Sequence, residues 1–506
     1  MEILTSLLFL ALIFFLSIKA IRSFVFPRSK RLNIPPGPKP LPIIGNLLEL
    51  GGKPHKSLAK LSESYGPIMC LKLGQVTTII VTSPSIAKDI IQKNSQFFSN
   101  RKVPDAISAS EHQHFSLAWL PISNLWRNLR KIISTHLLAA RVLDANMNLR
   151  HNKVEEFLRD VRKNSEAGES VEIGKAAFMT SLNLLSSTFF SMDLADSNSD
   201  TGEEIKEAVR GMIEEMGRPN IADSFPFLKM IDPQGIRKRN NIYFRKMLDL
   251  FDTIINQRSK LGAKSASGKD TDILDILIDL TENAEDKRVH EQLQKSTIGH
   301  LLLDIFGAGT ETTSATLEWS MAELLKAPEA MSKAQAELEQ VIGKGKKMKE
   351  SDIPQLPYLQ AIIKETLRLH PPAPLLVPRL AESDVEVCGY TIPKDAQVLI
   401  NVWAIGRDPN VWENPDKFMP ERFLKSNIDA GGRDFELIPF GAGRRICPGM
   451  LLANRILHLT LGSLLNSFDW KLEDGVEPDT LNMEDKYGLT LIMDQPLRAF
   501  PTATST

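Results

Sequence analysis

Cysteine is scarce in this 506-residue sequence, and its scarcity excludes two kinds of cross-linked scaffold. The chain has only Cys70, Cys388 and Cys447, which are odd in number, far apart and never arranged as Cys-x-x-Cys. Neither a disulfide framework nor a zinc ribbon fits that pattern. Cys70 and Cys388 are interpreted as small buried hydrophobic residues, whereas Cys447 has distinctive neighbours.

An excess of either charge is also missing. The 61 Lys and Arg residues balance 62 Asp and Glu residues, which leaves a net charge of −1. There is no dense basic stripe with interleaved aromatic residues, so we expect no nucleic acid among the partners. There is no internal repeat and, beyond residue 50, no linker-like stretch, so one large globular body is expected.

Long apolar runs are confined to the amino terminus. From Ile3 to Phe26 only Lys19 and Arg22 carry charge, and long cations of this kind can reach the interface of a bilayer that about 20 apolar residues span. A cleaved signal peptide or a buried helix is the alternative. Most basic residues follow the run, which favours a retained anchor with the remaining bulk in the cytosol. Residues 1–26 are therefore predicted to be a single-pass membrane anchor.

A basic and then proline-rich hinge is predicted at residues 27–45. It contains Pro-Pro-Gly-Pro-Lys-Pro-Leu-Pro, ending at Pro42, where fixed φ angles and missing N–H groups disfavour helix. We interpret it as a stiff spacer, with a proline-rich ligand for a partner domain as the alternative. Residues 46–506 are then predicted to form the globular body.

Helical periodicity dominates this body, which predicts a mainly α fold with a minor β-sheet. Leu71 to Val81 is rich in β-branched residues and is predicted to be a strand. Glu386 to Ile400 is predicted to form short strands around a turn at Gly389 and another at residues 393–395. Clusters of turn-forming or charged residues predict exposed loops at 196–202, 262–272 and 343–350.

Cys447 lies in Phe440-Gly-Ala-Gly-Arg-Arg-Ile-Cys-Pro-Gly449, ahead of an apolar helical stretch. Glycines such as Gly443 and Gly449 allow a backbone tight enough to lie against a flat macrocycle, and the amino end of the helix favours a thiolate. Phe440 would shield the sulfur and Arg445 would meet a carboxylate. The pattern predicts that Cys447 is the axial ligand of haem b; an ordinary glycine-rich turn with a buried cysteine is the alternative.

A second motif interrupts a predicted helix between Ile298 and Leu325. Gly307-Ala-Gly-Thr-Glu-Thr-Thr313 places two glycines in the helix interior, each costing about 1 kcal/mol relative to alanine. Glycine would let a ligand approach, and the threonine hydroxyls could bond preceding carbonyls and open the helix locally. Glu311 and Thr312 would supply an acid and an alcohol as catalytic groups. The alternative is a weak point stabilised by packing.

These motifs together resemble the cytochromes P-450, the haem-thiolate monooxygenases, from the predicted anchor to the carboxyl end. The resemblance implies that haem lies between the long central helix and the helix after the cysteine loop. Glu311 and Thr312 match the family's acid-alcohol pair, although Glu stands where Asp is often seen. The resemblance further implies a buried ion cluster of Glu365, Arg368 and Arg422. It also implies that the haem propionates are neutralised by Trp126, Arg130, Arg379 and Arg445.

Three other stretches are similar to plant microsomal enzymes of the geraniol hydroxylase and ferruginol-type oxidase group: the proline-rich start, Ala-Trp-Leu-Pro121 and Tyr487-Gly-Leu-Thr-Leu491. The group implies an endoplasmic reticulum membrane protein that uses dioxygen. Since the sequence has no nicotinamide or flavin motif, electrons from NADPH would come from a separate reductase.

The resemblance also suggests a substrate pocket whose residues are mainly apolar. They are Ala118, Leu120, Ile305, Ala308, Pro374, Leu375 and Leu489. Such a lining favours a terpenoid, either a monoterpenol such as geraniol or an abietane diterpene, over a zwitterionic amino acid. Hydroxylation of a phenolic substrate such as tyrosine, a haem-thiolate isomerase or dehydratase that does not use dioxygen, and a non-catalytic haem carrier are the alternatives.

Overall fold

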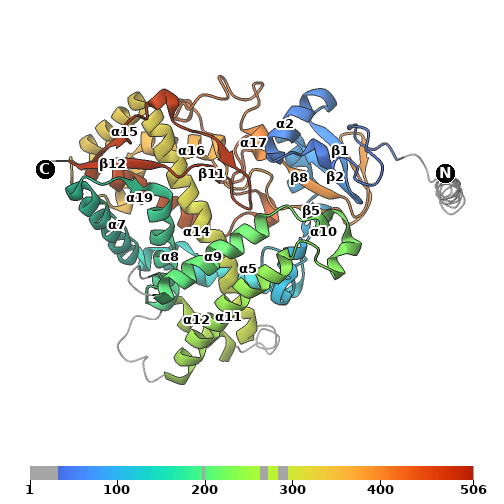
Figure 1. The fold of residues 1–506 in the computed structure, drawn as a ribbon, viewed down its shortest axis with the longest axis horizontal. Coiled ribbons are helices and arrows are strands. Elements are labelled where there is room, and N and C mark those ends of the chain that lie inside the picture. The colour runs from blue at the N-terminus through green and yellow to red at the C-terminus, as the bar shows by residue number, and fades with distance from the viewer. Residues whose placement is uncertain (1–31, 196–199, 262–271, 283–293, 505–506) are drawn as a thin grey trace, which may run out of the picture.

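A large helical region and a smaller region built on a sheet make up the computed structural model (Figure 1). The structure describes residues 32–195, 200–261, 272–282 and 294–504. The predicted anchor, the start of the hinge and the loop at 262–271 lie outside these residues. Within the described ranges, no helix is both long enough and apolar enough to cross a bilayer.

Helices account for most of the fold, as predicted. The longer ones are α2 (Pro54–Tyr65), α5 (Asn124–Ile132), α7 (Met147–Ala167), α8 (Ile173–Phe190), α9 (Asp200–Gly217), α11 (Ile236–Leu261), α12 (Ile273–Glu282), α14 (Lys295–Lys326), α15 (Pro328–Val341), α16 (Pro357–Leu369) and α19 (Met450–Ser467). The shorter ones are α3 (Pro84–Lys88), α4 (Ser95–Phe98), α6 (Ala140–Ala145), α10 (Ile221–Ser224), α17 (Val402–Ile405) and α18 (Glu421–Leu424). Proline begins α2, α15 and α16, where its missing N–H costs no helical bond.

The main sheet has the strand order β1-β2-β8-β5-β3. Its strands are β1 (Ile68–Leu73), β2 (Val76–Val81), β8 (Gln397–Ile400), β5 (Arg379–Leu380) and β3 (Asn100–Arg101). β2 and β8 are parallel, whereas the other neighbours are antiparallel. The prediction of one strand over Leu71–Val81 is wrong. Gly74, with φ of 58°, turns the chain so that most of this segment forms the second half of a hairpin.

Smaller sheets lie outside the main one. They are β4 (Val171–Glu172), β12 (Arg498–Ala503) and β9 (Phe468–Leu472); β6 (Val385–Val387) and β7 (Tyr390–Ile392); and β10 (Asp485–Lys486) and β11 (Ile492–Met493). The turn between β6 and β7 contains Gly389, with φ of 78°, as the sequence predicted. The loop predicted at 196–202 is shorter than expected, because α9 already begins at Asp200.

The central helix α14 runs through the helical region and packs against α8, α11, α16 and α19 (Figure 1). From Thr313 to Leu325 every residue is buried, which marks this half as interior on all sides. The helix is continuous from Lys295 to Lys326, so the predicted local opening at residues 307–313 is absent.

The part of the predicted hinge that the structure describes lies against the sheet. The Cys70 N–H donates to the Pro36 carbonyl at 2.8 Å, and Gly45 bridges to Leu73. A side chain at Gly37 would overlap the Cys70 carbonyl, so this segment packs closely along β1. It is free of helix, as expected for its prolines.

Candidate active site

The cysteine loop is closed by a backbone hydrogen bond from Cys447 N–H to the Phe440 carbonyl at 2.9 Å. Gly443 has φ of 66°, and a Cβ there would lie 3.0 Å from the Ile91 carbonyl oxygen. A side chain at this position would therefore be strained and crowded. Phe440 packs against the hydrophobic core beside the loop.

The Cys447 sulfur lies at the amino end of α19. Burial raises the pKa of the Cys447 thiol, whereas hydrogen bonds from the Gly449 and Met450 N–H groups and the charge of Arg130 lower it. Arg130, on α5, is half-buried, and burial lowers its pKa while the cysteine charge raises it. The loop thus provides the N–H donors and the nearby cation that a thiolate ligand requires.

Three arginines gather beside this loop without carboxylate partners. Arg101 and Arg379 are opposite each other in the β3–β5 pair, and Arg445 belongs to the cysteine loop. Burial lowers the pKa of Arg379 to about 10. Burial, together with the charges of neighbouring arginines, lowers the pKa of Arg445 to about 10 and that of Arg101 well below its ordinary value. Within the described ranges, none of the three forms an ion pair.

The hydrogen bonds of these arginines are incomplete. Arg379 Nη1 donates to the Phe98 carbonyl at 3.0 Å, and Arg101 Nη1 donates to the Val377 carbonyl at 2.7 Å. The Nε atoms of both arginines are buried with no hydrogen-bond partner. Buried cations and orphaned donors of this kind are costly unless an anion meets them. An anionic group with two carboxylates, such as haem with its propionates, fits this surrounding.

Trp126 and Arg445 are in contact, because the Arg445 guanidinium lies 4.6 Å from the centre of the Trp126 ring. The single indole N–H of Trp126 donates to the Leu117 carbonyl at 3.1 Å. Arg445 also donates to Leu117 at 3.0 Å, to Ser99 at 2.9 Å and to Leu120. Since a guanidinium has five N–H groups, Arg445 retains donors for an anion, whereas the Trp126 donor is already used.

The predicted acid and alcohol lie next to each other at the middle of α14. The Thr312 hydroxyl donates to the Ala308 carbonyl at 2.5 Å, as predicted for a threonine in this motif. Burial raises the pKa of the Glu311 carboxyl, while a hydrogen bond from Thr490 and the charges of Arg210 and Lys486 lower it. Glu311 therefore keeps its proton to a higher pH than an ordinary glutamate, which suits a proton donor.

The accessible face of α14 is defined by Ile305, Ala308 and Thr312, which recur at helical spacing. Ala308 is exposed and the other two are half-buried, although Phe306 and Thr310 between them are buried. The exposed Ala308 methyl group shows that this part of the central helix is not covered by other side chains.

The two glycines of the motif serve helix packing, which corrects the prediction that they admit a ligand. A Cβ on Gly307 would lie 3.1 Å from the Met212 side chain of α9. A Cβ on Gly309 would lie 3.0 Å from the Leu185 side chain of α8. The glycines let two neighbouring helices approach α14, whereas the exposed position on this part of the helix is Ala308.

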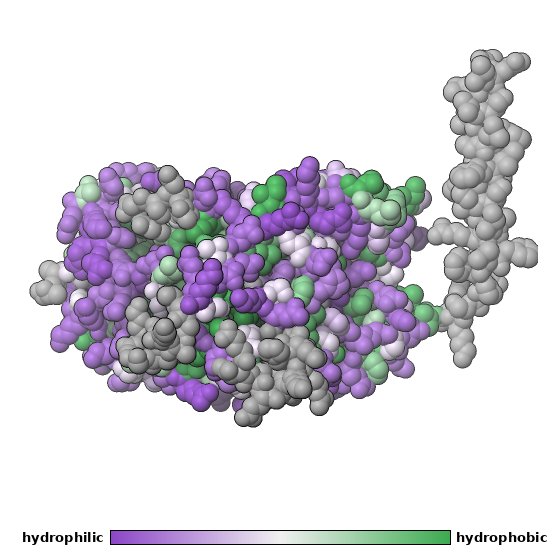
Figure 2. Space-filling view, turned by 90° about the horizontal axis from the view of Figure 1, so that it is seen from below, coloured by the Kyte–Doolittle hydropathy of each residue, from purple (hydrophilic) through white to green (hydrophobic). Residues whose placement is uncertain are grey.

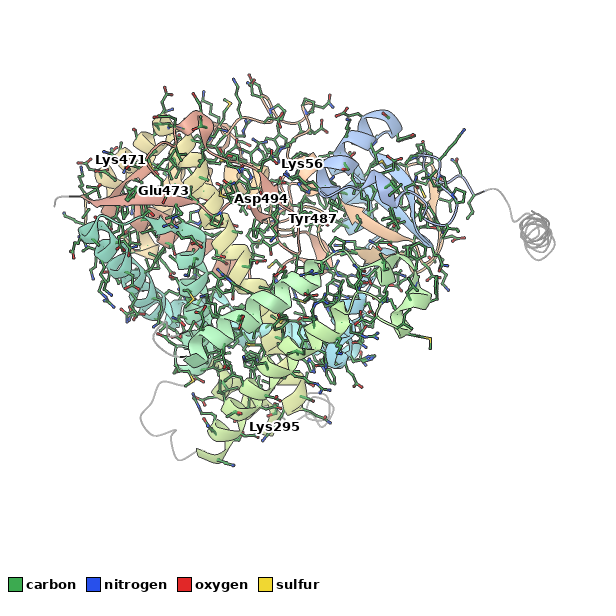
Figure 3. All side chains as sticks on the ribbon, in the orientation of Figure 1. Lys56, Lys295, Lys471, Glu473, Tyr487 and Asp494 are labelled. Carbon is green, nitrogen blue, oxygen red and sulfur yellow. The ribbon has the colours of Figure 1, made fainter. Side chains whose placement is uncertain are left out.

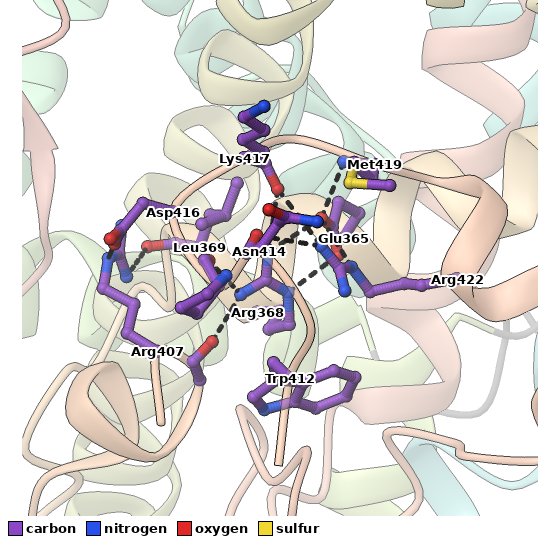
Figure 4. A network of polar contacts seen from close by, with 12 residues as sticks. Glu365, Arg368, Leu369, Arg407, Trp412, Asn414, Asp416, Lys417, Met419 and Arg422 are labelled. Atoms are coloured by element: carbon purple, nitrogen blue, oxygen red, sulfur yellow. Dashed lines mark hydrogen bonds and ion pairs between the residues drawn. The ribbon is translucent and has the colours of Figure 1, made fainter. Parts of the chain in front are cut away.

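The structure brings the three residues of the predicted ion cluster together (Figure 4). Arg368 makes a two-pronged bond to Glu365, with distances of 2.7 and 2.8 Å, and Arg422 Nε donates to Glu365 at 3.0 Å. Glu365 and Arg368 are fully buried, and Arg368 also donates to three backbone carbonyls. Trp412 lies 5.4 Å from the Arg368 guanidinium. Every charged member of the cluster therefore has ion-pair and hydrogen-bond partners within the protein.

The predicted pocket residues divide into two groups. Ala118, Ile305, Ala308 and Leu489 are at least partly accessible, whereas Leu120, Pro374 and Leu375 are buried. Leu375 packs with Leu58, Met69, Leu71, Ile80 and Leu399 in a core beneath the main sheet, so it is a core residue. Leu489 is 37% exposed and sits against the end of α9, where a Cβ on Gly217 would overlap the Leu489 backbone nitrogen.

Two residues of the site were missed from the sequence, Arg101 and Thr490. The loop that carries Thr490 is anchored near α2, where the His55 ring stacks on Tyr487 with centroids 5.5 Å apart. Figure 3 labels Tyr487 close to Lys56 of α2. His55 also contacts Asp485 at 3.3 Å. The sequence around Arg101 carries no motif that distinguishes it from a surface segment. Arg101 is assigned to the site only because strand pairing places it opposite Arg379.

Comparison with known proteins identifies the family. The model of the family described as Cytochrome P450 matches residues 35–497. The chain is a cytochrome P450. It is 53% identical to a geraniol 8-hydroxylase of Swertia mussotii over 97% of this chain and 98% of the relative. It is 52% identical to a geraniol 8-hydroxylase of Catharanthus roseus, with the same coverage, and 50% identical to a drimenol monooxygenase of Persicaria hydropiper over 94% of this chain and 93% of the relative.

Membership of the family confirms the predicted fold class and enzyme class. The protein is a cytochrome P450 monooxygenase, an oxidoreductase of mainly α fold with small sheets. Enzymes of this kind hold haem through a cysteine thiolate and use dioxygen with electrons from a redox partner.

Proposed function

We propose that this cytochrome P450 hydroxylates a terpenoid alcohol, with geraniol as the first candidate, and that Cys447 is the axial ligand of its haem. The observation that carries the ligand assignment is the pair of N–H groups, from Gly449 and Met450, directed at the Cys447 sulfur beside Arg130. Two geraniol 8-hydroxylases and a drimenol monooxygenase among the relatives support the substrate class.

Arg101, Arg379, Arg445 and Arg130 would hold the haem carboxylates, because these cations are buried or half-buried and lack carboxylate partners. When bound, haem supplies the iron centre at which dioxygen is activated. Gly443 and Gly449 keep the loop beneath it narrow. Ala308 leaves room on the α14 side, since its side chain is a single methyl group.

Glu311 and Thr312 would handle the protons that the splitting of dioxygen requires. Burial raises the pKa of Glu311, so it keeps its proton to a higher pH than an ordinary glutamate. The Thr312 hydroxyl, which donates to the Ala308 carbonyl, presents its oxygen lone pairs to a water or substrate. Ile305 and Leu489 would contact an apolar substrate and exclude water.

The electron donor would be the NADPH-dependent reductase, and the location the cytosolic face of the endoplasmic reticulum. Exposed apolar residues support contact with a membrane: Ile43, Phe227, Met230 and Ile231 are 62% to 89% exposed. The Gln75 N–H bonds the Ser224 carbonyl, so these segments lie at the same end of the molecule as β1 and β2. Figure 2 shows apolar surface at that end.

The test is a turnover assay with membranes containing the full chain, a plant reductase and NADPH. Geraniol, an abietane diterpene and tyrosine are supplied separately, and products are identified by mass. A geraniol product one oxygen heavier, formed only with NADPH and dioxygen, is expected. Turnover of tyrosine alone would overturn the terpenoid proposal, and a rearranged product formed without NADPH would overturn oxygenation.

A further inference from the structure

Two histidines and an aspartate form a buried network on the first half of α14, away from Glu311 and Thr312. His300 and Asp304 are one turn apart on α14, which begins at Lys295 (Figure 3). His112 belongs to a 3-10 segment, η3 (Asp105–His114). His112 Nδ1 lies 2.9 Å from His300 Nδ1, and His112 Nε2 lies 3.1 Å from Asp304 Oδ1. We call His112, His300 and Asp304 the histidine network.

The hydrogen bonds of Asp304 place a proton on His112 Nε2. Asp304 accepts from the Ser116 hydroxyl at 2.6 Å and from the Leu117 N–H at 2.7 Å, so its carboxylate is an acceptor on both oxygens. His112 Nε2 must then donate to Asp304. Burial and the neighbouring His112 lower the pKa of His300 to about 4, so this ring is neutral at pH 7. When His112 is neutral as well and donates from Nε2, its Nδ1 accepts from the His300 Nδ1–H.

Leu117 links this network to the cysteine loop. Its N–H donates to Asp304 on α14, and its carbonyl accepts from Trp126 Nε1 and Arg445 Nη1. The next residues, Ala118 and Leu120, are pocket candidates, and the Leu120 carbonyl also accepts from Arg445. One short segment therefore joins the central helix to the arginine that faces the haem carboxylates.

We propose that His112 is a positioning residue of the active site. By bonding both His300 and Asp304, His112 keeps the segment 112–120 in contact with α14. This contact fixes the position of Ala118 in the proposed pocket wall, and of the Leu117 and Leu120 carbonyls that orient Arg445. Phe115 stacks on His300 with centroids 4.7 Å apart, and Phe244 packs against His112. These contacts restrict the orientation of the His112 ring to one in which it bonds both His300 and Asp304. The roles of Ala118 and Arg445 and the substrate measured in the test rest on the proposed function, whereas the attachment of residues 112–120 to α14 does not.

The test compares His112→Ala with His370→Ala in the haem-loaded full chain. His370 is a matched control because it bonds Glu323 of the same helix at 2.6 Å and is also buried, about 28 Å further along α14. For His112→Ala we expect the KM for geraniol to rise about tenfold with kcat within about twofold. Amide hydrogen exchange of residues 115–120 should accelerate at least about tenfold.

Rescue separates positioning from a general loss of structure. His112→Gln keeps one donor for Asp304 and one acceptor for His300, so it should recover most of the KM and of the exchange protection. If His112→Ala does not load haem, Ser116→Ala removes one of the three bonds to Asp304 and should give a smaller change in the same direction.

The proposal is overturned if His112→Ala leaves the exchange of residues 115–120 unchanged, or if His370→Ala alters KM and this exchange equally. Failure of the wild-type enzyme to turn over geraniol would instead reject the proposed substrate. Hydrogen exchange needs no substrate, so it still decides the role of His112 in that case.

Discussion

This protein has two groups of buried arginines, which differ in whether a carboxylate of the protein pairs with them. In the ion cluster, Arg368 and Arg422 share the Glu365 carboxylate, and backbone carbonyls take further N–H groups. Beside the cysteine loop, Arg101, Arg379 and Arg445 have no carboxylate within the described part of the chain, and two Nε atoms have no partner. A complete cluster stabilises the fold, whereas we propose that the incomplete one is the place where an anionic group binds.

Cys447→Ser should give the largest effect, because it removes the group that we assign to the iron. Turnover should be abolished while the chain stays folded, since the sulfur is not part of either arginine group. The reduced carbon monoxide complex should lose the red-shifted absorption band that thiolate ligation produces. A variant that keeps this band and its activity would contradict the ligand assignment.

Glu365→Gln breaks the complete cluster and should reduce the free energy of unfolding by about 3–5 kcal/mol, because two buried arginines lose their charge partner. Urea unfolding measures this loss. Glu473→Gln, in an exposed pair with Arg498, is the control and should cost less than about 1 kcal/mol. Equal losses of unfolding free energy in the two variants would show that the buried cluster contributes no more to stability than an exposed ion pair.

Arg379→Met tests the incomplete group with the opposite expectation. Without haem, the variant should be as stable as the wild type or more so, because a buried cation without a partner is removed. With haem, the affinity should fall about tenfold, which corresponds to about 1.4 kcal/mol. Haem titration of the apoprotein measures both. Unchanged affinity would show that Arg379 does not meet the cofactor.

Thr312→Ala should retain haem and both arginine groups but yield several-fold less product per NADPH consumed, because the hydroxyl beside Glu311 is lost. Thr316→Ala is the control. Its hydroxyl bonds the carbonyl four residues back in the same manner, but it is buried. If product per NADPH falls equally in both variants, the effect belongs to the helix and not to proton delivery.

Glu318 is a buried carboxyl on α14 that has hydrogen-bond partners but forms no ion pair with any residue that the structure describes. It accepts hydrogen bonds from the backbone N–H groups of Leu497 and Gly174. Burial raises the pKa of Glu318 to about 7. The folded state therefore holds this proton more tightly than the unfolded state, and stability should fall as pH rises from about 4.5 to about 7. Unfolding measured across this range should show a flatter profile for Glu318→Gln; an identical slope would contradict the assignment.

The sequence predicted those parts of the site that lie in short contiguous motifs. Cys447, the Glu311-Thr312 pair and the Glu365-Arg368 pair have their neighbours within a few residues, so spacing alone indicates their geometry. Arg101 and Thr490 were missed because their partners are brought by strand pairing and loop anchoring over hundreds of residues. The same limit applies to Leu375, which packs in a core, since apolar composition does not distinguish a pocket wall from a core.

Gly217 has no side chain, and its backbone therefore packs directly against the backbone of a segment far away in the sequence, at Leu489. The last residue of α9 lies so close to the Leu489 backbone that neither can move toward the other. A large substrate that displaced Leu489 would therefore shift the end of α9 as well, and would move Thr490, which hydrogen-bonds Glu311. In the proposed function, this single contact would link the size of the substrate admitted to the hydrogen bonding of the Glu311 carboxyl.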